Sequence, residues 1–300
     1  MAKPELLDRC HDVVIAGGGI AGLTLALALK KALGDAISVC LCDARVTADG
    51  TDQRASAIAP DGVSFFRRIG VWDAIADKTQ PILAMKVIDA FKSDTFRPAM
   101  LTFVSKSVDS GPLAHMTFHA DLERELFATC AANGVVSYPQ NFRNYAVSGD
   151  WAQASLDTGE MLRCALIVAA DGARSKLRSQ ARITTIGRAY GQSAIVVTIE
   201  HAKDHEAVAF ENFLPSGVLA TLPLPGRRSS IVWVEQSEVA QRLVLASPDV
   251  FMASLREAVG PRLGALSVVG APRAFALNLQ IARRFVGDRL RAPSTMGAGG

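Results

Sequence analysis

Residues 11–43, HDVVIAGGGIAGLTLALALKKALGDAISVCLCD, contain the pattern that decides the fold. Residues 11–16 form a mostly β-branched run, which is typical of a strand covered on both faces. Residues 20–33 are good helix formers, and lysines late in this stretch complement the helix dipole. Strand character returns over residues 36–42. The stretch therefore predicts a βαβ unit with a right-handed crossover and two parallel strands.

A glycine-rich turn joins the first strand to the helix. Its residues fit the pattern G-x-G-x-x-G and are Gly17, Gly18, Gly19, Ile20, Ala21 and Gly22. The first glycine permits a tight turn, the second lets the backbone approach a pyrophosphate, and the third lets the helix pack closely. Asp43 ends the second strand, where a carboxylate suits a ribose diol. These residues predict a dinucleotide site, with NAD and FAD both open; a turn without a ligand is the alternative.

The composition describes a globular chain with ample core. The 300 residues are 49% hydrophobic and 20% charged, which excludes collagen-like, disordered and coiled-coil proteins. Lysine and arginine number 32 against 29 acidic residues, a net charge of +3. This small and scattered excess does not indicate a nucleic-acid partner.

The cysteines and the first apolar run each have an ordinary explanation. Cys10, Cys40, Cys42, Cys130 and Cys164 form no C-x-x-C pair, and no histidine is spaced to complete a zinc site. We therefore predict buried free thiols and no metal. Residues 13–29 carry no charge, but 17 residues are short for a membrane span and four glycines interrupt them. A buried strand, turn and helix in a cytoplasmic protein is the better interpretation.

The rest of the chain predicts a second, more antiparallel unit. We expect helices at 62–75, 120–132 and 248–259, and antiparallel strands between 85 and 104. Further strands are expected at 135–138, 145–147, 152–156, 162–170, 195–199, 218–222 and 230–234. The predicted fold class is α/β, with a Rossmann-like FAD- or NAD-binding domain interleaved with a smaller, mostly antiparallel α+β substrate domain. The first would comprise residues 1–75, 113–182 and 272–300, and the second residues 76–112 and 183–271.

A second motif follows the buried strand at 166–168. Residues 169–178, AADGARSKLR, resemble the "DG" element of flavin-dependent aromatic hydroxylases. In that element the Asp and Gly hold the pyrophosphate region of FAD, and the basic residues lie near the reduced nicotinamide. The resemblance thus implies that Asp171 and Gly172 bind the cofactor. A plain β-turn is the alternative.

The resemblance extends from about residue 11 to about residue 290. Residues 52–58 (DQRASAI) and 65–72 (FFRRIGVW) are similar to a stretch of the FAD-dependent hydroxylases of ubiquinone biosynthesis, the UbiH/Coq6-like family. Three more stretches look like the substrate-domain core of that family. They are residues 210–217 (FENFLPSG), 222–224 (LPL) and 229–233 (SSIVW).

The resemblance implies both a cofactor site and an activity. It implies a glutathione-reductase type FAD-binding domain, in which Gly17, Gly19, Gly22 and Asp43 hold the ADP half. Arg54 would lie in a mobile loop beside the isoalloxazine, and His119 and Arg124 in the segment that enters a helix against the cofactor. The alternatives are a solvated loop charge for Arg54, a helix cap for His119, and a surface partner of Glu123 or Glu125 for Arg124.

The implied enzyme is a monooxygenase that hydroxylates a prenylated phenol with NAD(P)H and dioxygen through a C4a-hydroperoxyflavin. The cofactor supplies that chemistry, and no side chain is predicted as an acid or base. The implied partners are a prenylated aromatic molecule and dioxygen, with peripheral contact to the inner membrane or to a ubiquinone-biosynthesis complex. Two other classes stay open: a non-catalytic or inactive FAD-binding protein, and an NAD-dependent dehydrogenase.

The chain departs from the family pattern near its end. The family continues from its "RRF" stretch through a strand to Gly-Asp-Ala-Ala-His and a long helix. Here residues 282–290 (ARRFVGDRL) are followed by residues 291–300 (RAPSTMGAGG), which have no periodicity. We interpret Gly287 and Asp288 as the turn before the expected strand. A chain truncated before the GD motif would lack helix-end N–H groups near the flavin and bind FAD less tightly.

Overall fold

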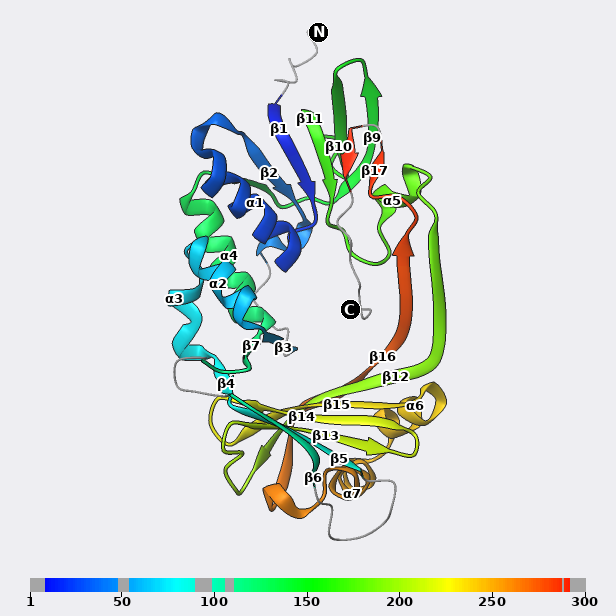
Figure 1. Ribbon diagram of the computed structural model, residues 1–300. Coiled ribbons are helices and arrows are strands. Elements are labelled where there is room, and N and C mark those ends of the chain that lie inside the picture. Colours follow the sequence, from blue (N-terminus) through cyan, green and yellow to red (C-terminus); the bar gives the residue numbers. More distant parts are fainter. Residues whose placement is uncertain (1–8, 48–53, 90–98, 106–110, 288, 292–300) are drawn as a thin grey trace.

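The computed structural model describes residues 9–47, 54–89, 99–105, 111–287 and 289–291. Two large sheets form two layers, and a pair of long strands runs between them (Figure 1). A small three-stranded sheet lies between the helices of the first layer and the second large sheet. Its strands are β3 (Ala55–Ile58), β4 (Gln80–Ile82) and β7 (Ala114–Phe118), in the order β3-β7-β4.

The first large sheet contains the predicted βαβ unit. Its main path is β17-β18-β11-β1-β2-β8, and β10 and β9 extend it from β11. The strands are β1 (Arg9–Ala16), β2 (Val39–Cys42), β8 (Val136–Tyr138), β9 (Phe142–Ser148), β10 (Trp151–Leu156), β11 (Met161–Ala169), β17 (Val286–Gly287) and β18 (Leu290–Arg291). Strand β1 is parallel to both β2 and β11, as the sequence predicted for the first pair.

Both faces of β1 are buried, which explains its continuous apolar run. Val13 and Ile15 pack in a cluster with helices α1 (Ile20–Leu33) and α4 (His119–Ala132). Val14 and Ala16 point to the opposite face and pack with β10 and β11. Helices α2 (Pro60–Arg68) and α3 (Trp72–Ile75) extend the layer of α1 and α4. A short helix, α5 (Lys176–Gln180), follows β11.

The second large sheet has the order β16-β12-β15-β14-β13-β5-β6. Its strands are β5 (Ala84–Asp89), β6 (Ala99–Val104), β12 (Thr185–His201), β13 (Val208–Leu214), β14 (Gly217–Leu224), β15 (Arg228–Gln236) and β16 (Leu266–Ala282). Helices α6 (Ser237–Leu245) and α7 (Pro248–Val259) pack on one face of it. Strands β12 and β16 continue from this sheet to the first layer (Figure 1). Four short 3₁₀ turns complete the described elements: Gly34–Ala36, Ala44–Thr47, Ala76–Lys78 and Pro261–Leu263.

Several predicted elements are correct, and others need correction. The single helix expected over 62–75 is wrong, because Gly70 has φ +80° and ends α2. The N–H of Val71 bonds back to the carbonyl of Phe66 at 2.9 Å, as in a glycine-terminated helix. Strand β16 and helix α6 were not predicted. Of the five cysteines, Cys10 is exposed rather than buried, whereas the other four are buried and all are free.

The last part of the chain is described only to residue 291. Gly287 belongs to β17 and pairs with Leu290 of β18, so it lies in a strand rather than in the expected turn. Asp288, residues 292–300 and the residues Asp52 and Gln53 lie outside the described part of the chain.

Candidate functional site

The glycine turn is held in contact with the end of β11. Gly17 has φ +117°, and its N–H donates to the carbonyl of Cys42 at 2.9 Å. A Cβ on Gly17 would lie 2.1 Å from the carbonyl oxygen of Ala170, and a Cβ on Gly22 would lie 1.9 Å from that of Gly17. Both distances are far below a normal contact, so the turn and the start of α1 accept only glycine at these two positions.

The third glycine, Gly19, has a different environment. A Cβ there would meet nothing within 4 Å. Gly19 is the N-cap of α1, no side chain caps this helix, and its first turn contains no acidic residue. Uncapped N–H groups at a helix start, together with the helix dipole, form an anion site. The room beside Gly19 therefore fits a pyrophosphate.

Asp43 is bound to the glycine turn on one side and to Arg45 on the other. Its Oδ2 accepts from the Gly18 N–H at 2.8 Å and from Arg45 Nη2 at 3.1 Å, and its Oδ1 accepts from the Arg45 N–H at 2.8 Å. Only 6% of Asp43 is exposed. Burial opposes ionisation, but these hydrogen bonds and the guanidinium charge outweigh it and lower the pKa of Asp43. The carboxylate is thus ionised at neutral pH.

Asp171 lies on the other side of β1. Ala16 pairs with Cys42 of β2 and with Ala169 of β11, so the two carboxylates follow strands that flank the glycine turn. Asp171 Oδ2 accepts from the Lys176 N–H at 2.8 Å and caps α5. Its Oδ1 is buried and has no hydrogen-bond partner among the described residues. A buried carboxylate oxygen in this state requires a donor, and a cofactor hydroxyl would supply one.

Arg54 and His119 are brought together by the pairing of β3 with β7. The His119 N–H donates to the Arg54 carbonyl at 2.9 Å, and His119 Nε2 lies 2.6 Å from Ser56 Oγ. Arg54 is half-buried. Arg124 is exposed and forms a 2.8 Å ion pair with Asp121 in the same helix, rather than with Glu123 or Glu125. Its role at the cofactor stays a prediction.

Two features of the site were not found from the sequence. The first is Arg45, which binds Asp43 through its backbone N–H and its guanidinium. Its position two residues after the carboxylate at the strand end was the only feature of the sequence that could have indicated this contact. A cavity of about 560 Å³ lies between the DG element and the long strands. It is lined by Ala173 and Arg174, by Arg188 of β12 and by Asn278 of β16, among others. The residues that line this cavity could not be predicted from the sequence, because several of them belong to β16, which was not predicted.

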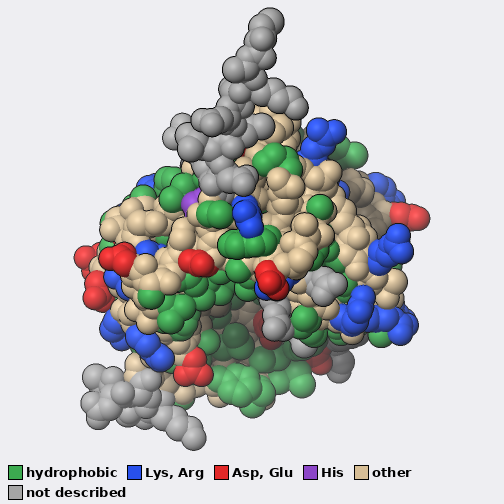
Figure 2. Space-filling view, turned by 90° about the horizontal axis from the view of Figure 1, so that it is seen from above, with side chains coloured by type: hydrophobic (Ala, Val, Ile, Leu, Met, Phe, Trp, Pro, Cys, Tyr) green, Lys and Arg blue, Asp and Glu red, His purple; other side chains and the backbone are tan. Residues whose placement is uncertain are grey.

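A buried apolar cluster lies where the small sheet meets the second large sheet. Ile82 and Met116 of the small sheet are buried with Ala209 and Leu224 of the second sheet. Figure 2 shows hydrophobic side chains gathered in and around a hollow in the molecule. No group of three or more metal-ligating side chains occurs among the described residues. Over the same part of the chain, no helix is long and apolar enough to cross a membrane.

The glycine turn, the uncapped helix and the strand-end carboxylate define a dinucleotide-binding α/β protein. The Asp171 element beside this turn and the antiparallel sheet next to it narrow the class further. The chain belongs to the FAD binding domain family, which matches residues 10–291. The bound dinucleotide, which the glycine pattern left open, is therefore FAD.

Known relatives agree with the resemblance found in the sequence. The chain is 35% identical over 289 residues to the ubiquinone hydroxylase UbiL of Rhodospirillum rubrum, covering 94% of this chain and 65% of that protein. It is 28% identical to the mitochondrial ubiquinone biosynthesis monooxygenase COQ6 of Mus musculus, covering 84% of this chain and 56% of that one. The chain thus spans less than two thirds of both relatives.

A solved structure shares the fold. The crystal structure of PqsL from P. aeruginosa in complex with 2-aminobenzoylacetate superposes with a TM-score of 0.80 at 18% identity. The match covers 95% of this chain and 78% of PqsL. The predicted fold class and the resemblance to the ubiquinone-biosynthesis hydroxylases are both confirmed.

Proposed function

We propose that this chain carries the FAD-dependent hydroxylation of a prenylated phenol in ubiquinone biosynthesis, with NAD(P)H and dioxygen as co-substrates. The names of the UbiL and COQ6 relatives support this substrate class. The observation that carries the proposal is the placement of Asp43 and Asp171 on the two sides of one glycine turn. When bound, FAD supplies the electron transfer from NAD(P)H and the activation of dioxygen.

Each residue of the site would bind a different part of the cofactor. The N-terminus of α1, from Gly18 to Gly22, would bind the pyrophosphate, and Asp43 would bind the ribose diol. Asp171 Oδ1 and the Gly172 backbone would bind a polar group further along the cofactor. Arg54 would approach the flavin from the edge of the small sheet, and Arg124 would contribute positive charge from α4.

The substrate would enter between the two layers. We propose that residues 1–75, 113–182 and 272–300 form the FAD-binding domain, and that residues 76–112 and 183–271 form the substrate domain. Each large sheet has its own buried apolar core, which supports this division. A further buried apolar cluster lies at the junction where the small sheet meets the second sheet. A dry junction suits a prenylated ring and protects reactive oxygen species from water. Arg174 and Arg188, which line the cavity beside the DG element, would attract the phosphates of NAD(P)H.

An absorbance titration followed by a turnover assay tests this function. The purified 300-residue chain is mixed with FAD, and NAD(P)H oxidation is then followed with and without 2-prenylphenol under ¹⁸O₂. We expect flavin uptake, phenol-stimulated NAD(P)H oxidation and one labelled oxygen in the product. Flavin uptake without a labelled product would indicate a non-catalytic flavoprotein. Binding of NAD without flavin would indicate a dehydrogenase, and either result overturns the proposal.

A further inference from the structure

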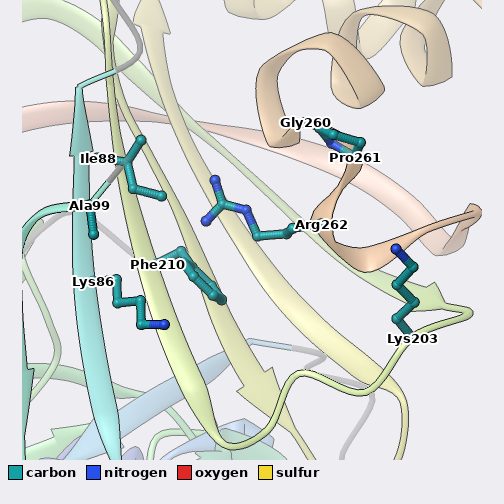
Figure 3. Close-up of a pocket in the computed structure, with 8 residues that line it drawn as sticks. All are labelled: Lys86, Ile88, Ala99, Lys203, Phe210, Gly260, Pro261 and Arg262. Atoms are coloured by element: carbon teal, nitrogen blue, oxygen red, sulfur yellow. The ribbon is translucent and has the colours of Figure 1, made fainter. Parts of the chain in front are cut away.

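A cationic cavity lies on the second sheet, away from the glycine turn. Its volume is about 450 Å³. Figure 3 shows the eight described residues that line it: Lys86, Ile88, Ala99, Lys203, Phe210, Gly260, Pro261 and Arg262. Three of these eight are cationic and none is acidic. The sequence did not indicate this site, because its residues come from five separate segments.

The pairing of the strands places this cavity on the outer face of the sheet. Lys86 of β5 lies beside Phe210 of β13. The next residues inward along these strands, Met85 and Ala209, point to the opposite face and pack against Met116 of the small sheet. Since neighbouring residues of a strand point to opposite faces, Lys86 and Phe210 face away from the FAD-binding layer. The cavity is therefore separate from the cofactor site.

The guanidinium of Arg262 is held in place by two uncharged groups. Its Cζ lies 4.1 Å from the centroid of the Phe210 ring, and its Nη2 donates to Asn212 Oδ1 at 3.1 Å. Asn212 is fully buried, and its own amide donates to the Ala258 carbonyl at 3.2 Å. A stacked guanidinium with a fixed hydrogen bond loses little entropy when it binds an anion.

The two lysines complete the charge of the cavity. Lys86 is half-buried on the sheet, and Lys203 is exposed on the segment that follows β12. Both line the cavity. Figure 3 shows Lys86 beside Phe210, on the side to which the Arg262 guanidinium points, and Lys203 on the other side of the Arg262 backbone. Ile88, Phe210 and Pro261 supply apolar wall between these cations. The arrangement combines charged donors with a surface suited to an apolar or aromatic group.

We propose that this outer cavity binds an organic phosphate, a molecule in which a phosphoryl group is attached to an apolar or aromatic moiety. Arginine and lysine donors suit the several oxygens of a phosphoryl group, and charge-assisted hydrogen bonds are the strong ones. The apolar wall would contact the remainder of the ligand. A soluble phosphate ester and a lipid headgroup share this chemistry, and the experiment distinguishes them.

Calorimetric titration of the 300-residue chain with phenyl phosphate tests the site, with benzyl alcohol as the uncharged probe. We expect saturable binding of phenyl phosphate and none of benzyl alcohol. Lys86→Gln, Lys203→Gln and Arg262→Gln should each weaken binding by about tenfold. Arg256→Gln removes an exposed cation of α7 that does not line the cavity, so it should change the affinity by less than about twofold. If Arg262→Gln does not fold, the two lysine variants still test whether the cavity binds phenyl phosphate.

Two further arms identify the source of the phosphate and separate this site from the cofactor. Competition by phosphatidylglycerol vesicles, but not by phosphatidylcholine vesicles, would assign a lipid headgroup; no competition would assign a soluble ester. Asp171→Ala should leave phenyl phosphate binding unchanged, even if it abolishes flavin uptake. The proposal is overturned if phenyl phosphate shows no saturable binding, or if Arg256→Gln or Asp171→Ala weakens binding as much as Lys86→Gln.

Discussion

Asp43 Oδ2 accepts a 2.8 Å hydrogen bond from the backbone N–H of Gly18. This bond ties the end of β2 to the middle of the glycine turn, so the carboxylate and the turn are positioned as one unit. Asp43 is therefore both a structural partner of the turn and the group expected at the ribose. A test of FAD binding must separate these two roles, and the glycines of the turn offer a way to do so.

Gly17→Ala should destabilise the chain much more than Gly19→Ala. A Cβ on Gly17 meets the Ala170 carbonyl at 2.1 Å in a left-handed backbone, so this variant should lose about 3 kcal/mol or more of unfolding free energy. Gly149→Ala, also at positive φ but in open space, should lose only about 1 kcal/mol. Gly19 has φ −77° and open space, so Gly19→Ala should cost under about 1 kcal/mol.

The same Gly19→Ala variant should weaken FAD binding by tenfold or more, because its methyl group takes the room assigned to the pyrophosphate. Urea unfolding and flavin fluorescence titration measure the two effects. A Gly19→Ala chain with unchanged flavin affinity would place the pyrophosphate elsewhere.

Asp171 and Ser175 both cap α5, but only Asp171 has an unpartnered buried oxygen. Asp171→Ala and Ser175→Ala should each cost about 1 kcal/mol through loss of a helix cap. Only Asp171→Ala should also reduce FAD affinity by about tenfold, since it removes the acceptor assigned to the cofactor. Equal flavin affinity in the two variants would contradict that assignment.

The stability of the chain should depend on the ionisation of Asp43. Because its pKa is lowered in the folded chain, its contribution is complete above the pKa of the unfolded chain. It is lost as the pH falls through the lower folded value, that is, from roughly pH 4 downward. Arg45→Gln removes an ion pair and raises the folded pKa of Asp43 toward its unfolded value, so the loss of stability on acidification should be smaller and should be complete at a higher pH. Urea unfolding between pH 2.5 and 6 measures this shift.

A matched control for that experiment is Arg289→Gln. It breaks the exposed Arg289–Asp150 pair, in which Asp150 is fully accessible. Exposed pairs contribute little, so the pH profile should stay that of the parent chain. An Arg45→Gln profile identical to this control would show that Arg45 does not hold the Asp43 carboxylate.

Native thiol reactivity should be confined to Cys10. Cys10 is exposed, and the other four cysteines are buried. Burial raises the pKa of Cys130 and of Cys164 to about 12, and a hydrogen bond with Cys42 together with burial raises that of Cys40. At pH 8 a maleimide should therefore label one thiol per chain, and Cys10→Ser should abolish labelling. Mass spectrometry of the intact chain counts the labels; more than one label without denaturant would contradict the buried positions.

Elements with a strong local pattern were predictable. The βαβ unit, α4 and α7 each combine a clear hydrophobic period with good propensity, and β1 is apolar on both faces because both are covered. The glycine roles were also predictable, because Gly17 and Gly22 are required by backbone contacts that the motif encodes. The DG element was interpretable only through its resemblance to a family, since Asp-Gly by itself is an ordinary turn.

Other features depend on contacts between distant segments. Most residues of β16 are exposed or half-buried, so no apolar alternation marks it, and its pairing with β12 stabilises it as a strand. The break at Gly70 arises from a positive φ that helical periodicity does not report. The outer cavity joins residues from positions 86 to 262, which no local window contains.

The order of residues along the chain determined which groups could bind a dinucleotide, because a strand, a glycine turn and a helix are built from near neighbours. Only the tertiary structure decided which of those groups lie close together. The parallel pairing of β1 with β2 and β11 places Asp43 and Asp171 around one turn, and the packing of α7 on the second sheet positions Arg262 over Phe210. Such long-range contacts follow from burying apolar surface cooperatively, and no short segment specifies them alone.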